Sequence, residues 1–183
     1  PESARGAAAL LVRMVLEDGA YTNIALNQYL RGSRLSDLDR RLATELVYGT
    51  VKASGTLDWY LAQCVSRPLD KVAGDILAIL RISTYQLLYM TRIPASAAVN
   101  EAVKLARSVS HEGSAKFVNG VLRGLLRKQE AGAFVLPDAE KQDADYLSLK
   151  YYHPRWLVKR WLGPWGRGGT ERLLAFDNTA APV

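Results

Sequence analysis

The stretch from Val72 to Met90 constrains the fold more than any other part of the chain. Wound as a helix at about 3.6 residues per turn, it is apolar nearly all round. A helix with hydrophobic side chains on every face has to be surrounded by other elements, because water would otherwise contact much of that surface. The sequence therefore predicts a helical bundle with this segment in its middle. Its apolar residues are Ile76, Leu77, Ile79, Leu80, Ile82, Tyr85, Leu87 and Leu88.

The rest of the chain repeats the helical period and has no convincing period-2 alternation, which predicts an all-α fold. We expect Ser36 and Ser96 to cap helices, Gly55 to break one, and Leu10 to face inward with Leu11. The chain has 183 residues, enough for one domain built from two packed sub-bundles. The predicted helices cover 4–17, 23–30, 37–52, 57–65, 72–90, 97–109 and 114–128, with shorter ones near 144–151, 154–162 and 171–176.

The segment Ser114–Lys128 separates into two faces when wound as a helix. One is broad and apolar, and the other carries Lys116, Arg123 and Arg127 in a narrow row without a carboxylate. Solvated helix faces usually mix both signs of charge, so a row of one sign suggests an anionic partner. An ordinary solvated face with chance spacing is the alternative.

Positive charge is concentrated in two blocks of the chain. The formal net charge is +6, yet cations and anions cancel up to Tyr60. From Asn100 to Glu130 there are 6 cations and 3 anions, and from Lys150 to Arg172 there are 6 and 1. A basic excess of this size is compatible with nucleic-acid binding.

Catalytic or metal-binding groups are scarce. Cys64 is the only cysteine, so an intrachain disulfide is impossible, and its amphipathic surroundings favour a small buried hydrophobe. His111 and His153 lie in predicted turns without a partner at metal-ligand spacing. We therefore expect no metal, no cofactor and no catalytic residue in this chain. We also expect neither a signal peptide nor a membrane span, and a reducing cytoplasm fits.

An aromatic cluster follows in the second basic block. It can stack on single-stranded bases, but docking of the last helices onto the bundle is the favoured interpretation. The cluster consists of Tyr151, Tyr152, Trp156, Trp161 and Trp165, beside Arg155, Lys159 and Arg160.

Three ordered segments together resemble the NusB-like helical RNA-binding domain. They are DRRLATELVYGTVK at Asp39–Lys52, ILRISTYQLLYMTRIPASAAVNEAVKLAR at Ile79–Arg107, and SAKFVNGVLRGLLR from Ser114. A fourth, LSLKYYHPRWLVKRWL at Leu147–Leu162, is similar to a run in bacterial RNA cytosine-5 methyltransferases of the Sun/RsmB type, where it joins the NusB-like domain to the catalytic domain.

This resemblance implies a NusB-like domain at 1–131 and a helical linker at 132–183 that leads towards a catalytic domain absent from this chain. The implied protein methylates cytosine-5 of small-subunit (16S) ribosomal RNA with S-adenosylmethionine, a cofactor of the absent domain. Ribosomal RNA and that catalytic domain are the implied partners. RNA phosphates are expected to contact Lys116, Arg123 and Arg127, then Lys104 and Arg107, and Arg5 at the N-terminus.

Two alternatives remain open. One is a stand-alone NusB-type antitermination factor, although such proteins carry an arginine-rich start where this chain has only Arg5 and Arg13. The other is a protein-docking module whose basic face meets an acidic patch of its own catalytic domain.

Overall fold

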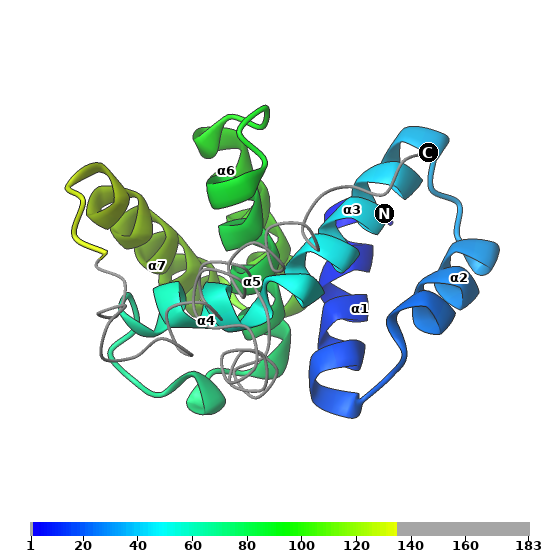
Figure 1. The fold of residues 1–183 in the computed structure, drawn as a ribbon, viewed down its shortest axis with the longest axis horizontal. Helices are drawn as coiled ribbons and strands as arrows, with labels where there is room; N and C mark the ends of the chain where they lie inside the picture. Colours follow the sequence, from blue (N-terminus) through cyan, green and yellow to red (C-terminus); the bar gives the residue numbers. More distant parts are fainter. Residues whose placement is uncertain (1, 135–183) are drawn as a thin grey trace, which may run out of the picture.

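The computed structural model describes residues 2–134, and these fold into helices connected by short turns (Figure 1). No strand occurs in this range, so the all-α prediction is confirmed. The elements are α1 (Ala4–Asp18), α2 (Thr22–Gly32), α3 (Asp37–Lys52), α4 (Ser54–Ala62), the short 3-10 helix η1 (Leu69–Lys71), α5 (Gly74–Tyr89), α6 (Ala95–Val109) and α7 (Glu112–Glu130).

Helix α5 lies at the centre, as its all-round apolar pattern predicts. It contacts α1, α3, α4, α6 and α7, and Figure 1 shows it between the α1–α3 group and the α6–α7 pair. Its residues from Ile76 to Leu80 are all buried. Gln86 is buried too, but both ends of its amide are satisfied: Nε2 donates to the Ile82 carbonyl (3.0 Å) and Oε1 accepts from Arg5 Nε (2.9 Å). The core thus includes one polar contact that ties α1 to α5.

The ends of several helices follow from single residues. The Ser36 side chain accepts from the Asp39 N–H, which confirms it as the cap of α3. Gly19 ends α1 with φ 73°, a left-handed conformation that glycine adopts without a steric penalty.

Three local predictions are wrong. Gly55 does not break a helix: the chain turns at buried Ala53, and Gly55 sits in the first turn of α4. Ser96 is not a cap, because α6 begins at Ala95 directly after Pro94, whose fixed φ suits a helix start. Leu10 is 49% exposed, since α1 packs through small residues such as Ala7 and Ala8.

Helix α4 packs against Phe134, which lies shortly after α7. The Phe134 ring meets Tyr60 edge-on, with centroids 4.7 Å apart, and lies 6.1 Å from Trp59. Residues 131–134 therefore return against α4. The predicted helices near 144–151, 154–162 and 171–176, with the aromatic cluster among them, lie outside the described residues.

Gly49 sets how closely α3 approaches α5. A Cβ atom at this position would overlap the Tyr85 ring, whereas one at Gly120 of α7 would meet nothing within 4 Å. The glycine in the LVYGT sequence is therefore required by the crossing of these two helices.

We expect Gly49→Ala to lower the free energy of unfolding by about 1–3 kcal/mol, because the Tyr85 ring must move in a packed core. Gly120→Ala is the matched control, and it should raise stability by about 0.5–1 kcal/mol through helix propensity alone. Urea denaturation followed by circular dichroism measures both. Equal shifts for the two variants would contradict the packing explanation.

Candidate nucleic-acid interface

The α7 cation row, defined as Lys116, Arg123 and Arg127, lies on the exposed side of its helix. On the opposite side Val118, Leu122 and other apolar residues are buried against the core. Both predicted faces of the segment are therefore present. Within residues 2–134 none of the three cations pairs with a carboxylate, and Arg123 Nε donates to the neutral Asn119 Oδ1 (2.9 Å). None of the three cations forms an ion pair in this range, although Glu112 lies close enough to Lys116 for the two charges to attract. The row therefore keeps most of its positive charge, which favours an anion.

His111 fixes the start of this helix. Its Nδ1 accepts from the Ser114 N–H (3.2 Å), so the imidazole acts as the N-cap of α7. The sequence predicted a turn at His111, and the structure shows that this residue also caps the helix. Asn119 lies within α7 and positions Arg123.

Lys104 and Arg107 differ from the row because each faces an acidic side chain. Lys104 Nζ lies 3.7 Å from Glu101 on the same helix. Arg107 Nε donates to Glu112 Oε2 (2.6 Å), a contact that joins the end of α6 to the start of α7. The hydrogen bond from Arg107 lowers the pKa of Glu112, and Glu112 raises that of Arg107. Both pairs are exposed and therefore weak, so a phosphate can exchange with the carboxylate.

Arg5 lies on α1, outside the α6–α7 pair. It is half-buried on α1, and its guanidinium donates to Gln86 in the contact between α1 and α5. The structure therefore groups five of the six predicted residues on the α6–α7 pair and gives Arg5 a packing role.

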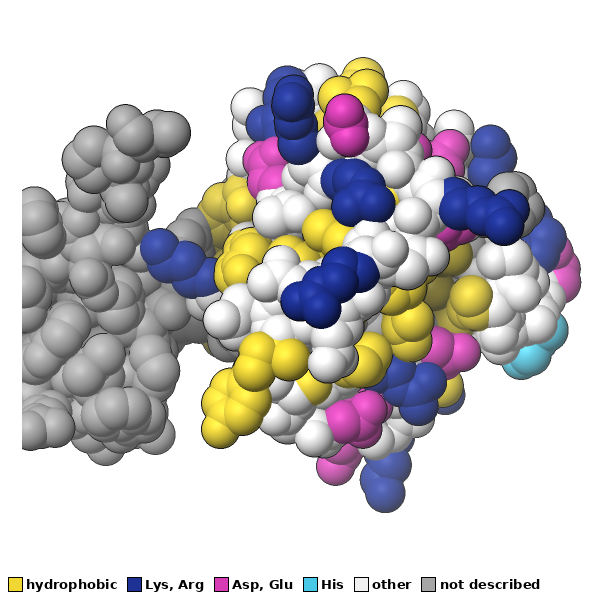
Figure 2. Space-filling view, turned by 90° about the vertical axis from the view of Figure 1, so that its right-hand side faces the viewer, with side chains coloured by type: hydrophobic (Ala, Val, Ile, Leu, Met, Phe, Trp, Pro, Cys, Tyr) yellow, Lys and Arg dark blue, Asp and Glu magenta, His cyan; other side chains and the backbone are white. Residues whose placement is uncertain are grey.

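The opposite side of the molecule has a different charge pattern. Figure 2 shows the side formed by α2 and α3, where Lys and Arg alternate with Asp and Glu and with hydrophobic side chains. Such mixing is typical of a solvated surface. The same-sign row on α7 stands out against it.

Arg67 and Lys71, which are not among the predicted site residues, border a cleft at the start of α7. They lie in a turn around Pro68 and η1, some 45 residues before that helix. No local pattern marks them, because only the tertiary fold brings this turn next to α7.

Cys64 has the environment of a structural cysteine. It is half-buried, and burial raises the pKa of its thiol, while the nearby Lys128 lowers it to a smaller extent. At neutral pH the thiol stays protonated and is a poor nucleophile. Among residues 2–134 no three His, Cys, Asp or Glu side chains are grouped as metal ligands would be. The same residues include no helix long and apolar enough to cross a membrane.

Comparison with known proteins identifies the family of this chain. Residues 2–127 match the model of the NusB family, and the chain belongs to this family. A solved structure titled as the antitermination factors NusB and NusE in complex with dsRNA has the same fold, with a TM-score of 0.62 and 21% identity. The match covers 68% of this chain and 93% of that one.

Two curated relatives are similar to most of this chain. A protein named probable ribosomal RNA small subunit methyltransferase B from Synechocystis is 40% identical over 96% of this chain and 39% of its own length. One with the same name from Bacillus subtilis is 37% identical over 86% of this chain and 34% of its own. The chain therefore spans less than two fifths of these relatives. The resemblance drawn from the sequence motifs is confirmed.

We expect the alkylation rate of Cys64 to rise with pH around a midpoint above the ordinary thiol value, because burial disfavours the thiolate. Lys128→Met should move the midpoint further up, since the cation that favours the thiolate is lost. Iodoacetamide labelling across a pH series measures the midpoint, with the urea-unfolded chain as the reference. A midpoint at or below that reference would show that the thiol is activated.

Proposed function

We propose that this chain is the RNA-binding domain of an S-adenosylmethionine-dependent ribosomal RNA cytosine-5 methyltransferase, and that it helps position the small-subunit RNA. The observation that carries the proposal is the α7 cation row, which forms no ion pair with a carboxylate within residues 2–134. Membership of the NusB family and the names of the relatives support it.

The row acts on the RNA backbone rather than on bases. Lys116, Arg123 and Arg127 project from one face at spacings of seven and four residues, about 17 Å from end to end. Cations that replace the counterions of phosphates provide affinity and register without reading the sequence. Arginine adds a planar fork that donates to a phosphate through two N–H groups.

Lys104 and Arg107 extend the contact onto α6. Each exchanges its exposed carboxylate partner for a phosphate, which costs little because surface ion pairs contribute little. Glu112 stays ionised near neutral pH, since Arg107 lowers its pKa, and it therefore limits how strongly this end of the row binds RNA.

Methyl transfer belongs to another part of the protein. S-adenosylmethionine is held in this class by a Gly-rich strand–loop–helix, and residues 2–134 contain no strand. These residues do not fit the cofactor. We assign residues 1–131 to the RNA-binding domain and residues 132–183 to the linker towards the catalytic domain, in a cytoplasmic enzyme.

The relatives favour this function over a stand-alone antitermination factor, because they are named as methyltransferases and are longer than the matched region. A basic face that docks on the catalytic domain instead of RNA is the remaining alternative, and an RNA-binding measurement separates the two.

We expect Lys116→Ala, Arg123→Ala and Arg127→Ala together to weaken binding to a small-subunit ribosomal RNA fragment by about tenfold or more. The slope of log affinity against log salt should fall by about 2 to 3, since up to three phosphate contacts are lost. Fluorescence anisotropy across a salt series measures both quantities.

The matched control is Arg31→Ala, Arg41→Ala and Lys52→Ala, which removes the same charge from exposed positions on α2 and α3. It should change affinity only slightly, through the net charge. If both triple variants lost the same affinity, the effect of the α7 variant would be explained by net charge alone. If the α7 variant bound RNA as tightly as the unsubstituted protein, the face would not contact RNA, and protein docking would remain as its role.

A further inference from the structure

A cleft of about 330 Å³ lies between the turn that carries η1 and the first turns of α7. Its edge is formed by the exposed side chains of Arg67 and Lys71 and by the first turn of α7. Buried Val72 and Ile76 form part of its floor. The function proposed above uses none of the residues that line it.

Arg67 is held in place without using its hydrogen-bond donors. Its guanidinium carbon lies 4.8 Å from the centroid of the Phe117 ring, a cation–π contact that orients the group over α7. No carboxylate within residues 2–134 pairs with Arg67 or with Lys71. Both cations therefore keep donors available for an anion.

The acidic groups nearby do not cancel this charge. Glu112 is bound to Arg107 by two hydrogen bonds, of 2.6 and 3.4 Å. Asp70 is exposed in η1 and does not line the cleft. The cleft therefore has a net positive edge.

The α7 side of the cleft supplies small polar groups. The hydroxyls of Ser110 and Ser114 lie 2.8 Å apart, and Ser114 Oγ lies 3.4 Å from Nε2 of His111. Because the two hydroxyls bond each other, one of their protons is left to donate to a phosphate, beside the cations and near the positive end of the helix dipole.

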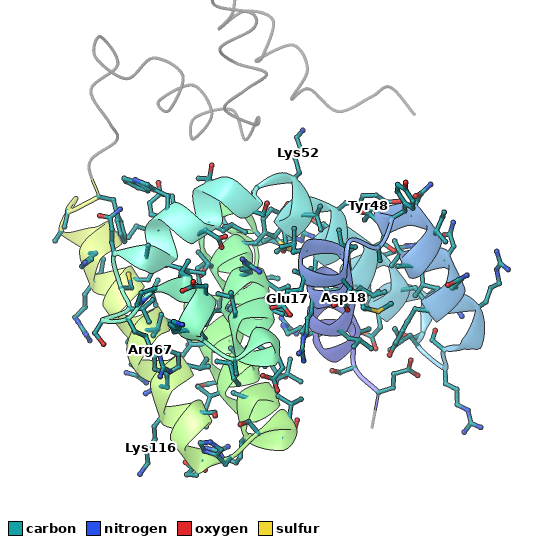
Figure 3. The ribbon with its side chains drawn as sticks, turned by 90° about the horizontal axis from the view of Figure 1, so that it is seen from below. Glu17, Asp18, Tyr48, Lys52, Arg67 and Lys116 are labelled. Atoms are coloured by element: carbon teal, nitrogen blue, oxygen red, sulfur yellow. The ribbon has the colours of Figure 1, made fainter. Side chains whose placement is uncertain are left out.

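The apolar floor indicates a phosphate that is attached to something larger. A free anion gains nothing from the apolar lining, whereas the ribose of a nucleotide has a carbon face that can cover its exposed part, which includes Ala73. Lys116 of the α7 cation row is the chain neighbour of Phe117, on which Arg67 rests. Figure 3 shows Arg67 and Lys116 beside the same helix, with Lys116 projecting outward near its start.

We propose that this cleft binds a phosphate and its ribose from the RNA strand that follows the α7 cation row, with Arg67 and Lys71 as the phosphate ligands. The inference rests on the proposed function and extends it, because it continues the RNA path from α7 onto the η1 turn. Three phosphates on α7 and one in the cleft then fix the direction of the strand as well as its position.

We expect Lys71→Ala to weaken binding of the full-length protein to the ribosomal RNA fragment several-fold and to lower the salt slope by about 1, since one phosphate contact is lost. Arg67→Ala with Lys71→Ala should weaken binding further. Lys71→Arg retains the charge and should bind the RNA fragment with the affinity of the unsubstituted protein. The single Lys71 variant guards against misfolding, because this side chain makes no ion pair within residues 2–134.

A second measurement follows the amide signals of Gly113 and Ser114 by NMR. They should shift with a short single-stranded RNA at far lower concentration than with inorganic phosphate. Equal responses to both ligands would indicate a free-anion site and overturn the proposal.

The two proposals fail in distinguishable ways. If Lys71→Ala leaves affinity and salt slope unchanged while the α7 triple variant weakens binding, the cleft proposal is wrong and the proposed function stands. If the cleft variants weaken binding and the α7 variant does not, the cleft is the RNA contact and the row is not. If no variant changes binding, both are wrong.

Discussion

Burial of α5 on all sides is the constraint on which the rest of the molecule depends. Because α1, α3, α4, α6 and α7 all contact it, the position of each helix is set relative to the same core. The α6–α7 pair consequently presents its polar side outward, and the turn at η1 comes to rest near the start of α7. A surface that binds a long anion has to keep its cations at fixed spacing, and a rigid helix packed on a common core does so at low entropic cost.

The sequence predicted the features that a single helix determines by itself. The burial of Val118 and Leu122 and the exposure of Lys116 follow from the period of 3.6 residues, which is a local property. The Ser36 cap also depends on neighbouring residues alone. The failures at Gly55, Ser96 and Leu10 arose where tertiary packing or a preceding proline outweighed a local preference.

What the sequence could not predict is which cation has a partner. Arg107 meets Glu112 across the turn between two helices, and Arg5 meets Gln86 from a helix 81 residues away. The sequence does not distinguish these two arginines from Arg127. In the fold, however, both have side-chain partners, whereas Arg127 forms no ion pair within residues 2–134. Arg67 is the reverse case: it lies in a turn that no sequence pattern marks, and the Phe117 ring orients its guanidinium.

The cations that stabilise the fold differ from those that we propose bind RNA. Arg81 donates to both carboxylate oxygens of Asp58, at 2.8 and 2.9 Å, and its side chain is only 12% exposed, so it ties α4 to α5. Removing one partner of such a pair leaves a poorly solvated charge, which destabilises the fold. The α7 row makes no ion pair within residues 2–134 and adds nothing comparable to stability. Its charges repel one another, and a bound anion would relieve that repulsion. The arrangement therefore offers little to the folded chain and favours the anion complex that we propose.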